Sequence, residues 1–99
     1  MEKLDDQDAG LKFFAAELRN DLPELDLHSS FESGQIEIVL DQFLCQQIRK
    51  EEGAAAIIYG GGKGVLRNIV LKALEKHPLV IGVKDQGGYC LAILGKVDI

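Results

Sequence analysis

The sequence predicts an α/β protein: a two-layer sandwich of a four-stranded mixed sheet with two helices on one face, preceded by an extra N-terminal helix. One observation is that apolar spacing switches along the chain between a period of two and a period near 3.6. The other is the order of elements after the first helix, βαβαββ. Because crossovers between parallel strands are right-handed, both later helices should cover the same face.

Residues 1–22 are predicted to be an acidic N-terminal extension with an amphipathic helix, and residues 23–99 to be the α/β domain. The helix is expected over residues 9–18 and should end near Arg19. Its apolar face is predicted to consist of Leu11, Phe14, Ala15 and Leu18, with Phe13 beside it. We expect this face to dock on the same chain.

Residues 24–28 are predicted to form the first strand of the sheet, because Leu25 and Leu27 alternate with Asp26 and His28. A polar loop follows. Helical spacing then predicts a second helix, which should end before the stop signal Gly53. Its inward side chains are expected to be Ile36, Val39, Leu40, Phe43, Leu44 and Ile48.

The second half of the chain predicts the remaining elements in turn. Residues 54–59 are a short apolar run bounded by glycines, which is typical of a buried strand. The segment VLRNIVLKAL predicts a third helix, whose inward side chains are expected to be Leu66, Ile69, Val70, Ala73 and Leu74. This helix should end at His77-Pro78, because helical geometry is disfavoured for a residue before proline. Residues 79–83 and 89–94 are expected to be strands, joined by a hairpin connection over residues 85–88.

The segment IIYGGGKGVLR joins the predicted second strand to the third helix, and we call its residues 60–64 the glycine turn. Glycine permits positive φ angles and lets a ligand approach the backbone closely. The N-terminus of the following helix should offer unpaired amides and partial positive charge to an anion. Gly64 follows Lys63 where a P-loop needs Ser or Thr, and Val65 stands where a dinucleotide fingerprint needs glycine. A turn that is glycine-rich only for tight geometry is the alternative.

Several polar residues should gather at the carboxyl ends of the first two strands, where ligands bind in open α/β sheets. His28 could act as a general acid or base, and Asp26 could orient its imidazole. The phosphate-binding set would be the backbone of the glycine turn with Lys63 and Arg67. Taken singly, each of these side chains could instead be an ordinary solvated or hydrogen-bonded group.

Charge is distributed unevenly along the chain. The net charge is −5, and residues 1–26 alone have a balance of −5. Residues 60–84 contain five basic residues (Lys63, Arg67, Lys72, Lys76 and Lys84) and one acid, Glu75. This balance fits a modest basic surface near the glycine turn, and it is weaker than the extended basic stripe of a strong nonspecific nucleic-acid binder.

Other features narrow the class of protein. Cys45 and Cys90 are expected to be buried, reduced side chains rather than a disulfide or a metal site. No apolar run approaches the length needed to cross a bilayer, and the N-terminus lacks the pattern of a signal peptide. We therefore expect a cytoplasmic protein without a membrane partner. We also expect a monomer rather than an oligomer.

Two motifs and their surroundings resemble the Smr (small MutS-related) domain family. The chain contains LDLH at residues 25–28, then LDQFL, then IIYGGGKGVLR, then a helix that closes in HP. The similarity spans roughly residues 24–95. It implies a compact α/β sandwich, and some family members are DNA-nicking enzymes or RNA endonucleases, some acting at ribosomes.

The family pattern matches this chain unevenly. Asp26 and His28 match the acid and histidine of the first motif, while the second motif is matched by Gly60, Gly62, Gly64, Leu66 and Arg67. Tyr59 stands where the family's turn usually has histidine, Ser29 where glycine is common, Gly61 where lysine is common and Lys63 where threonine is common. A tyrosine can donate to a phosphate or stack on a base, but its pKa of about 10 prevents acid/base work at neutral pH.

The resulting prediction is an Smr-type domain that binds RNA or DNA, with endonuclease activity through Asp26 and His28. Phosphate contacts are assigned to Tyr59, Gly60, Gly61, Gly62, Lys63, Gly64 and Arg67. No cofactor and no resident metal are expected, and the need for a divalent cation is left open. Two alternatives stay open: a catalytically impaired module that binds nucleic acid or the ribosome, and a protein-interaction domain without a phosphate site.

Overall fold

The computed structural model describes residues 6–27, 33–61 and 64–95 of the chain. These residues form the helices α1 (Asp6–Glu17), α2 (Ser33–Arg49) and α3 (Val65–Lys76), and the strands β1 (Glu24–Asp26), β2 (Ala54–Ile58), β3 (Val80–Asp85) and β4 (Tyr89–Leu94). Among these helices, none is both long and apolar enough to cross a membrane.

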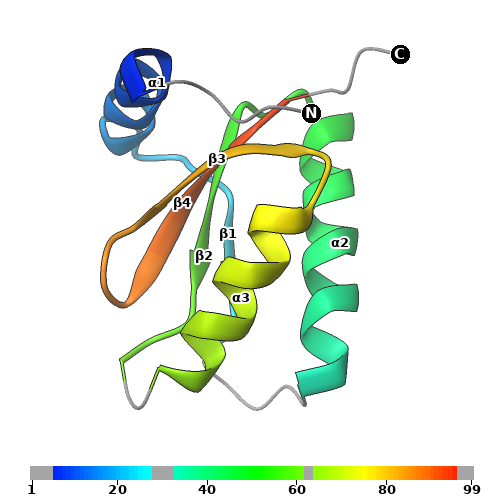
Figure 1. Cartoon of the computed structure of the whole chain (residues 1–99). Coiled ribbons are helices and arrows are strands. Elements are labelled where there is room, and N and C mark those ends of the chain that lie inside the picture. The colour runs from blue at the N-terminus through cyan, green and yellow to red at the C-terminus, as the bar shows by residue number, and fades with distance from the viewer. Residues whose placement is uncertain (1–5, 28–32, 62–63, 96–99) are drawn as a thin grey trace.

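The four strands form one mixed sheet in the order β1-β2-β4-β3 (Figure 1). β1 is parallel to β2, whereas β4 is antiparallel to both β2 and β3. The parallel pair needs a crossover, which α2 supplies, and the antiparallel pair β3 and β4 is joined by a short hairpin. The predicted βαβαββ architecture is confirmed.

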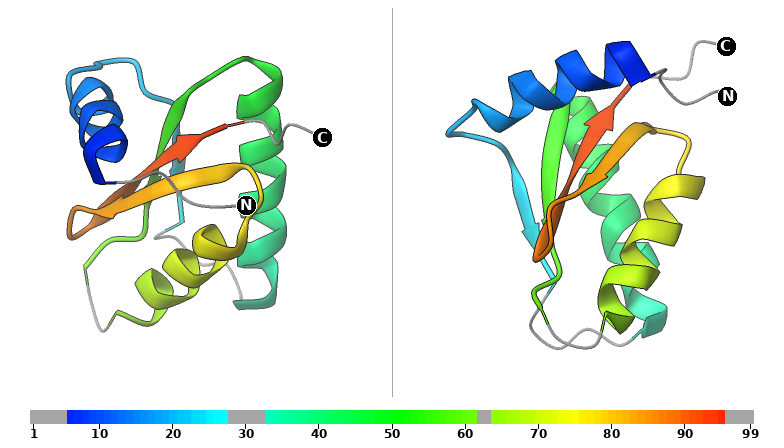
Figure 2. Two further views of the ribbon diagram at one scale, coloured as in Figure 1. Left: turned by 45° about the horizontal axis from the view of Figure 1, so that its top comes forward. Right: turned by 60° about the vertical axis from the view of Figure 1, so that its left-hand side comes forward.

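One face of the sheet, which we call the two-helix face, is covered by α2 and α3 (Figure 2). The predicted inward residues of both helices lie in its core or pack against it. The buried members of this core are Leu27, Ile36, Leu40, Leu44, Ala55, Ile57, Tyr59, Val70, Leu74, Val80, Cys90, Ala92 and Leu94. Side chains of β2 alternate, so Ala55 and Ile57 point to this face.

The opposite face of the sheet, which we call the α1 face, is covered by α1 (Figure 2, right). Phe13 and Ala16 are buried there against four sheet residues, Ala54, Ala56, Leu91 and Ile93. The expectation that the helix docks on its own chain is confirmed. Two ion pairs fix it: Lys84 Nζ lies 2.9 Å from Glu17 Oε1, and Arg19 Nη2 lies 3.0 Å from Glu52 Oε2.

The predicted buried face of the first helix is wrong. Leu11, Phe14 and Leu18 are 62–69% exposed, and Ala15 is exposed as well, whereas Phe13 is only 8% exposed. Apolar residues lie on several sides of this helix, so spacing alone could not identify the buried side. Phe13 is selected because it meets the alanines of β2 and the side chains of β4, which only the folded sheet brings together.

The third strand runs further than the sequence suggests. The sequence predicts a strand over residues 79–83, and in the structure the strand covers Val80–Asp85. Asp85 therefore belongs to the sheet, opposite Cys90 of β4, and not to the hairpin connection. Its side chain lies on the same side of the strand as Val83, which packs on the two-helix core. This placement brings Asp85 to the candidate site.

Candidate functional site

The carboxyl ends of β1 and β2 meet at one edge of the sheet because these strands are parallel. Asp26 and Ile58 are register partners, and the Leu27 amide donates to the Ile58 carbonyl at 2.7 Å. Asp26, which is exposed, thus ends β1 beside the start of the glycine turn. His28 follows the buried Leu27 in the chain and lies outside the described residues.

The glycine turn leaves β2 through a backbone that favours glycine. Gly60 has a φ of 75° and Gly64 a φ of 82°, values at which any side chain is strained. The amides of Tyr59 and Gly60 both donate to the carbonyl of Gly88, at 3.1 and 2.7 Å. The turn is thereby anchored on the β3–β4 hairpin. Gly62 and Lys63 lie outside the described residues.

The N-terminus of α3 faces the same edge. Gly64 is its N-cap residue, and within the described part of the chain neither a capping side chain nor an acidic residue of the first turn offsets the partial positive charge there. Arg67 is the third residue of the helix, so its side chain starts from this turn. Backbone amides and a guanidinium therefore share one end of α3.

Asp85 accepts hydrogen bonds from Tyr59, which directly precedes the glycine turn, and from Arg67, in the first turn of α3. We call Tyr59, Arg67 and Asp85 the Asp85 cluster. The Tyr59 hydroxyl donates to Oδ1 of Asp85. Arg67 donates to Oδ2 through Nε, at 2.6 Å, and through Nη2. The Gly87 amide completes the set by donating to Oδ1 at 3.1 Å. The cluster links β2, α3 and β3.

These contacts shift the pKa values of Asp85 and Tyr59 in opposite directions. Hydrogen bonds from Arg67 and Tyr59 hold the pKa of Asp85 well below its usual range. Burial, and then the hydrogen bond to Asp85, raise the pKa of Tyr59 well above its usual value. At neutral pH the carboxylate is therefore ionised and the phenol is protonated.

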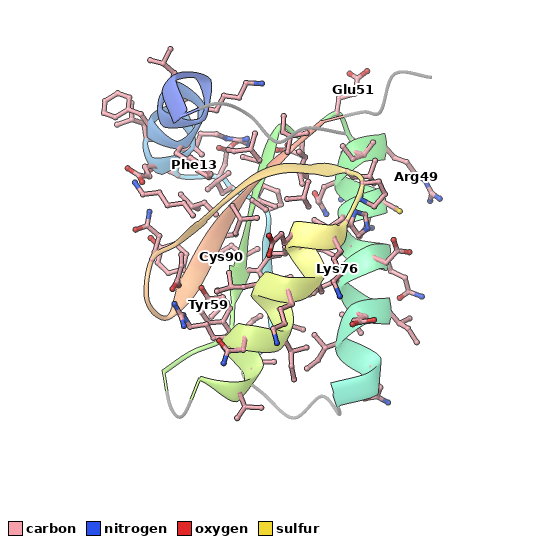
Figure 3. The ribbon with its side chains drawn as sticks, viewed as in Figure 1. Phe13, Arg49, Glu51, Tyr59, Lys76 and Cys90 are labelled. Carbon is pink, nitrogen blue, oxygen red and sulfur yellow. The ribbon has the colours of Figure 1, made fainter. Side chains whose placement is uncertain are left out.

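Tyr59 is a core residue in this arrangement. Its side chain is 3% exposed, and Figure 3 shows it at the end of β2, close to Cys90. Burial raises the pKa of the Cys90 thiol to about 12. Because the Tyr59 hydroxyl donates to Asp85, it holds the cluster together. Its predicted contact with a phosphate stays a prediction, and so does every other assigned phosphate contact.

Sequence reasoning missed Asp85, which it assigned to the hairpin connection. The signal that could have found it is strand parity. Val83 and Asp85 are two residues apart and share a side of β3, whereas Lys84 and Gln86 face α1. Both of these side chains donate to Oε1 of Glu17, at 2.9 and 2.8 Å.

His77 plays a structural part away from this site. Its Nδ1 accepts the Leu79 amide at 3.1 Å, so the ring proton must lie on Nε2, which donates to Asp41 Oδ1 at 2.8 Å. Both ring nitrogens are therefore engaged, and the contact with Asp41 joins the end of α3 to α2. Among the residues that the structure describes, no group of three or more His, Cys, Asp or Glu could hold a metal ion.

The fold is similar to the crystal structure of the Smr domain of Thermus thermophilus MutS2. The two share a TM-score of 0.70 at 21% sequence identity, over 76% of this chain and 100% of that chain. No curated protein matches the sequence. The model of the Smr domain family matches residues 25–89, which include both the LDLH segment and the glycine turn. This chain therefore belongs to the Smr domain family.

Proposed function

We propose that this Smr domain binds the phosphodiester backbone of RNA or DNA at the edge formed by the end of β1, the glycine turn and the start of α3. The observation that carries the proposal is the end of α3. There a glycine N-cap leaves the first-turn amides without a side-chain acceptor in the described part of the chain, and Arg67 belongs to the same turn.

The surroundings of this edge favour a phosphate group. Gly60 and Gly64 adopt positive φ and carry no Cβ, so the main chain there can approach a ligand closely. Space is also open at Gly61 and Gly64, where an added Cβ would meet no atom within 4 Å. An arginine presents donors in a geometry that suits phosphate oxygens.

Strand cleavage is the second candidate function, supported by the place of Asp26 at the same edge. If the substrate is RNA, His28, next but one along the chain, would remove the proton of a ribose 2′-hydroxyl. That oxygen would attack the adjacent phosphorus and form a 2′,3′-cyclic phosphate. The bond to the 5′-oxygen would break, and this leaving oxygen would take a proton from water. Tyr59 does not serve as the second acid/base group in this scheme, because its pKa is raised and its hydroxyl is bound to Asp85.

Binding is tested with two arginine variants and fluorescent RNA and DNA oligonucleotides over a range of salt concentrations. Arg67→Gln should weaken binding and reduce the slope of log K against log salt by about 1, since one phosphate contact is lost. Arg49→Gln is the matched control, because Arg49 lies at the C-terminal end of α2, far from Tyr59 in Figure 3. Equal effects of the two substitutions would refute the proposed site.

Cleavage is tested with structured RNA and supercoiled plasmid, with and without a chelator, for the unaltered chain and His28→Ala. We expect loss of cutting in the variant, with binding retained. Equal cutting by both proteins would remove His28 from the mechanism. Binding without any cutting by the unaltered chain would leave a nucleic-acid-binding module.

A further inference from the structure

We propose that Asp85 is a positioning residue, which holds the Arg67 guanidinium in the orientation that meets the phosphate. The proposal rests on the phosphate-binding function proposed above. Asp85 belongs to β3 and lies outside the LDLH segment and the glycine turn, yet in this proposal it sets the orientation of Arg67.

The geometry of the Asp85–Arg67 pair leaves the arginine able to bind a second anion. Both contacts of Arg67 go to the same oxygen, Oδ2, from Nε and Nη2. They occupy one edge of the planar guanidinium, and the hydrogen bonds and ion pairs given for the described residues include none at Nη1. The Arg67 side chain is 43% exposed and the Asp85 side chain 25%. The free edge can therefore reach a ligand while the paired edge stays fixed.

Asp85 is itself held on several sides. Oδ1 accepts the Tyr59 hydroxyl and the Gly87 amide, so each carboxylate oxygen has two donors. The neighbours of Asp85 in the chain, Lys84 and Gln86, both bind Glu17 of α1 on the other side of β3. A carboxylate fixed in this way restricts the arginine before any ligand arrives. Less side-chain freedom is then lost on binding.

The opposite role for Asp85 makes the opposite prediction. If Asp85 mainly neutralised Arg67 and repelled phosphate, removing its charge would strengthen binding. If it orients Arg67, removing its charge weakens binding, although the site becomes less negative. The positioning role is favoured because the four donors on Asp85 offset its charge while the outer edge of Arg67 remains exposed.

The test compares Asp85→Asn with Asp21→Asn. Asp21 also pairs with an arginine, since its Oδ1 lies 3.1 Å from Arg19 Nε, and its substitution removes the same charge far along the chain from the site. The probes are single-stranded RNA and DNA oligonucleotides. Asp85→Asn should weaken binding by about three- to tenfold and reduce the salt slope, whereas Asp21→Asn should change Kd by less than about twofold.

A double-mutant cycle shows whether Asp85 affects binding through Arg67. In the Arg67→Gln background, Asp85→Asn should have no further effect on Kd, because Asp85 acts through Arg67. Tyr59→Phe, which keeps every charge and removes one donor to Asp85, should shift Kd in the same direction to a smaller extent. This variant also serves if Asp85→Asn fails to fold.

The outcomes separate the two proposals. Tighter or unchanged binding by Asp85→Asn would overturn the positioning role while leaving phosphate binding intact. An equal effect of Asp85→Asn with and without Arg67 would overturn it too. If the unaltered chain bound neither oligonucleotide, the proposed function itself would be refuted, and the positioning role with it.

Discussion

The two faces of the sheet are buried in different ways. On the two-helix face, large aliphatic side chains of the helices and the sheet pack together, such as Leu44 of α2, Leu74 of α3 and Ile57 of β2. The α1 face packs one helix through Phe13 and Ala16 against two alanines of β2 and two residues of β4. One face is a broad core, and the other depends on a single aromatic side chain.

This difference has consequences for stability. Large residues that repeat with helical spacing bury much apolar area, so the two-helix face should dominate the free energy of unfolding. The alanines of the α1 face let the helix approach closely but bury little area each. We therefore expect the α1 face to open at a lower free energy than the opposite face.

The largest effect is expected from a cavity in the two-helix face. Leu44 of α2 is fully buried, so Leu44→Ala should lower the free energy of unfolding by about 2–5 kcal/mol. Chemical denaturation monitored by circular dichroism measures the change. A loss below about 1 kcal/mol would mean that the face is less tightly packed than the structure indicates.

A second prediction concerns the two thiols. Cys90 is fully buried on the two-helix face and burial raises its pKa to about 12, whereas Cys45 is half-buried. With a thiol-specific reagent at pH 8, Cys90 should react about 100-fold more slowly than Cys45, because it requires opening of the core. Similar rates for both thiols would contradict a closed two-helix face.

The α1 face offers a matched pair of adjacent phenylalanines. Phe13 is 8% exposed and Phe14 is 62% exposed. Phe13→Ala should cost about 1–3 kcal/mol, less than for a central core residue because α1 can undock, whereas Phe14→Ala should cost at most about 0.5 kcal/mol. Denaturation gives both values, and hydrogen exchange should show faster exchange in α1 with Cys90 still protected. Equal losses of stability in the two variants would mean that Phe14 is buried as well as Phe13, as the sequence predicts.

The smallest effect should appear on acidification. The pKa values of Asp85 and Glu17 are both lowered by hydrogen bonds, from Arg67 and Tyr59 to Asp85 and from Lys84 and Gln86 to Glu17. A lowered pKa in the folded state gives stability that is present above the ordinary carboxyl pKa of about 4 and is lost as pH falls through the folded value.

The two carboxylates can be distinguished by Asp85→Asn and Glu17→Gln. Each variant should be less stable than the unaltered chain at pH 7, and the difference should shrink below about pH 4. The shrinkage should be larger for Asp85, which accepts donors from three residues, than for the exposed Glu17. Tm measured against pH gives both curves, and parallel curves for all three proteins would contradict the assignment.

Much of the fold was predictable because the two-helix face follows simple periodicity. The inward residues of α2 and α3, from Ile36 to Leu74, were identified from helical spacing and are found in the core. The side of α1 that is buried was not predictable. Leu11, Phe14 and Leu18 form a more regular apolar stripe than Phe13 and Ala16. In the structure, however, the stripe is exposed, and Phe13 and Ala16 pack on the sheet.

The site was predictable in part. Parallel pairing places Asp26 beside the start of the glycine turn, as the strand order indicated. The role of Asp85 depends on how far β3 extends and on a contact between residues 18 positions apart, Arg67 and Asp85. No local pattern encodes that contact, so it required the folded chain.

The most direct test of phosphate binding at the glycine turn is an amide-shift titration with a short RNA and a short DNA. The largest shifts are expected at Gly60, Gly61, Gly64 and Arg67, while the amide of Ala16 on the α1 face should stay unchanged. Shifts confined to α1, or none at the glycine turn at saturating oligonucleotide, would contradict the account.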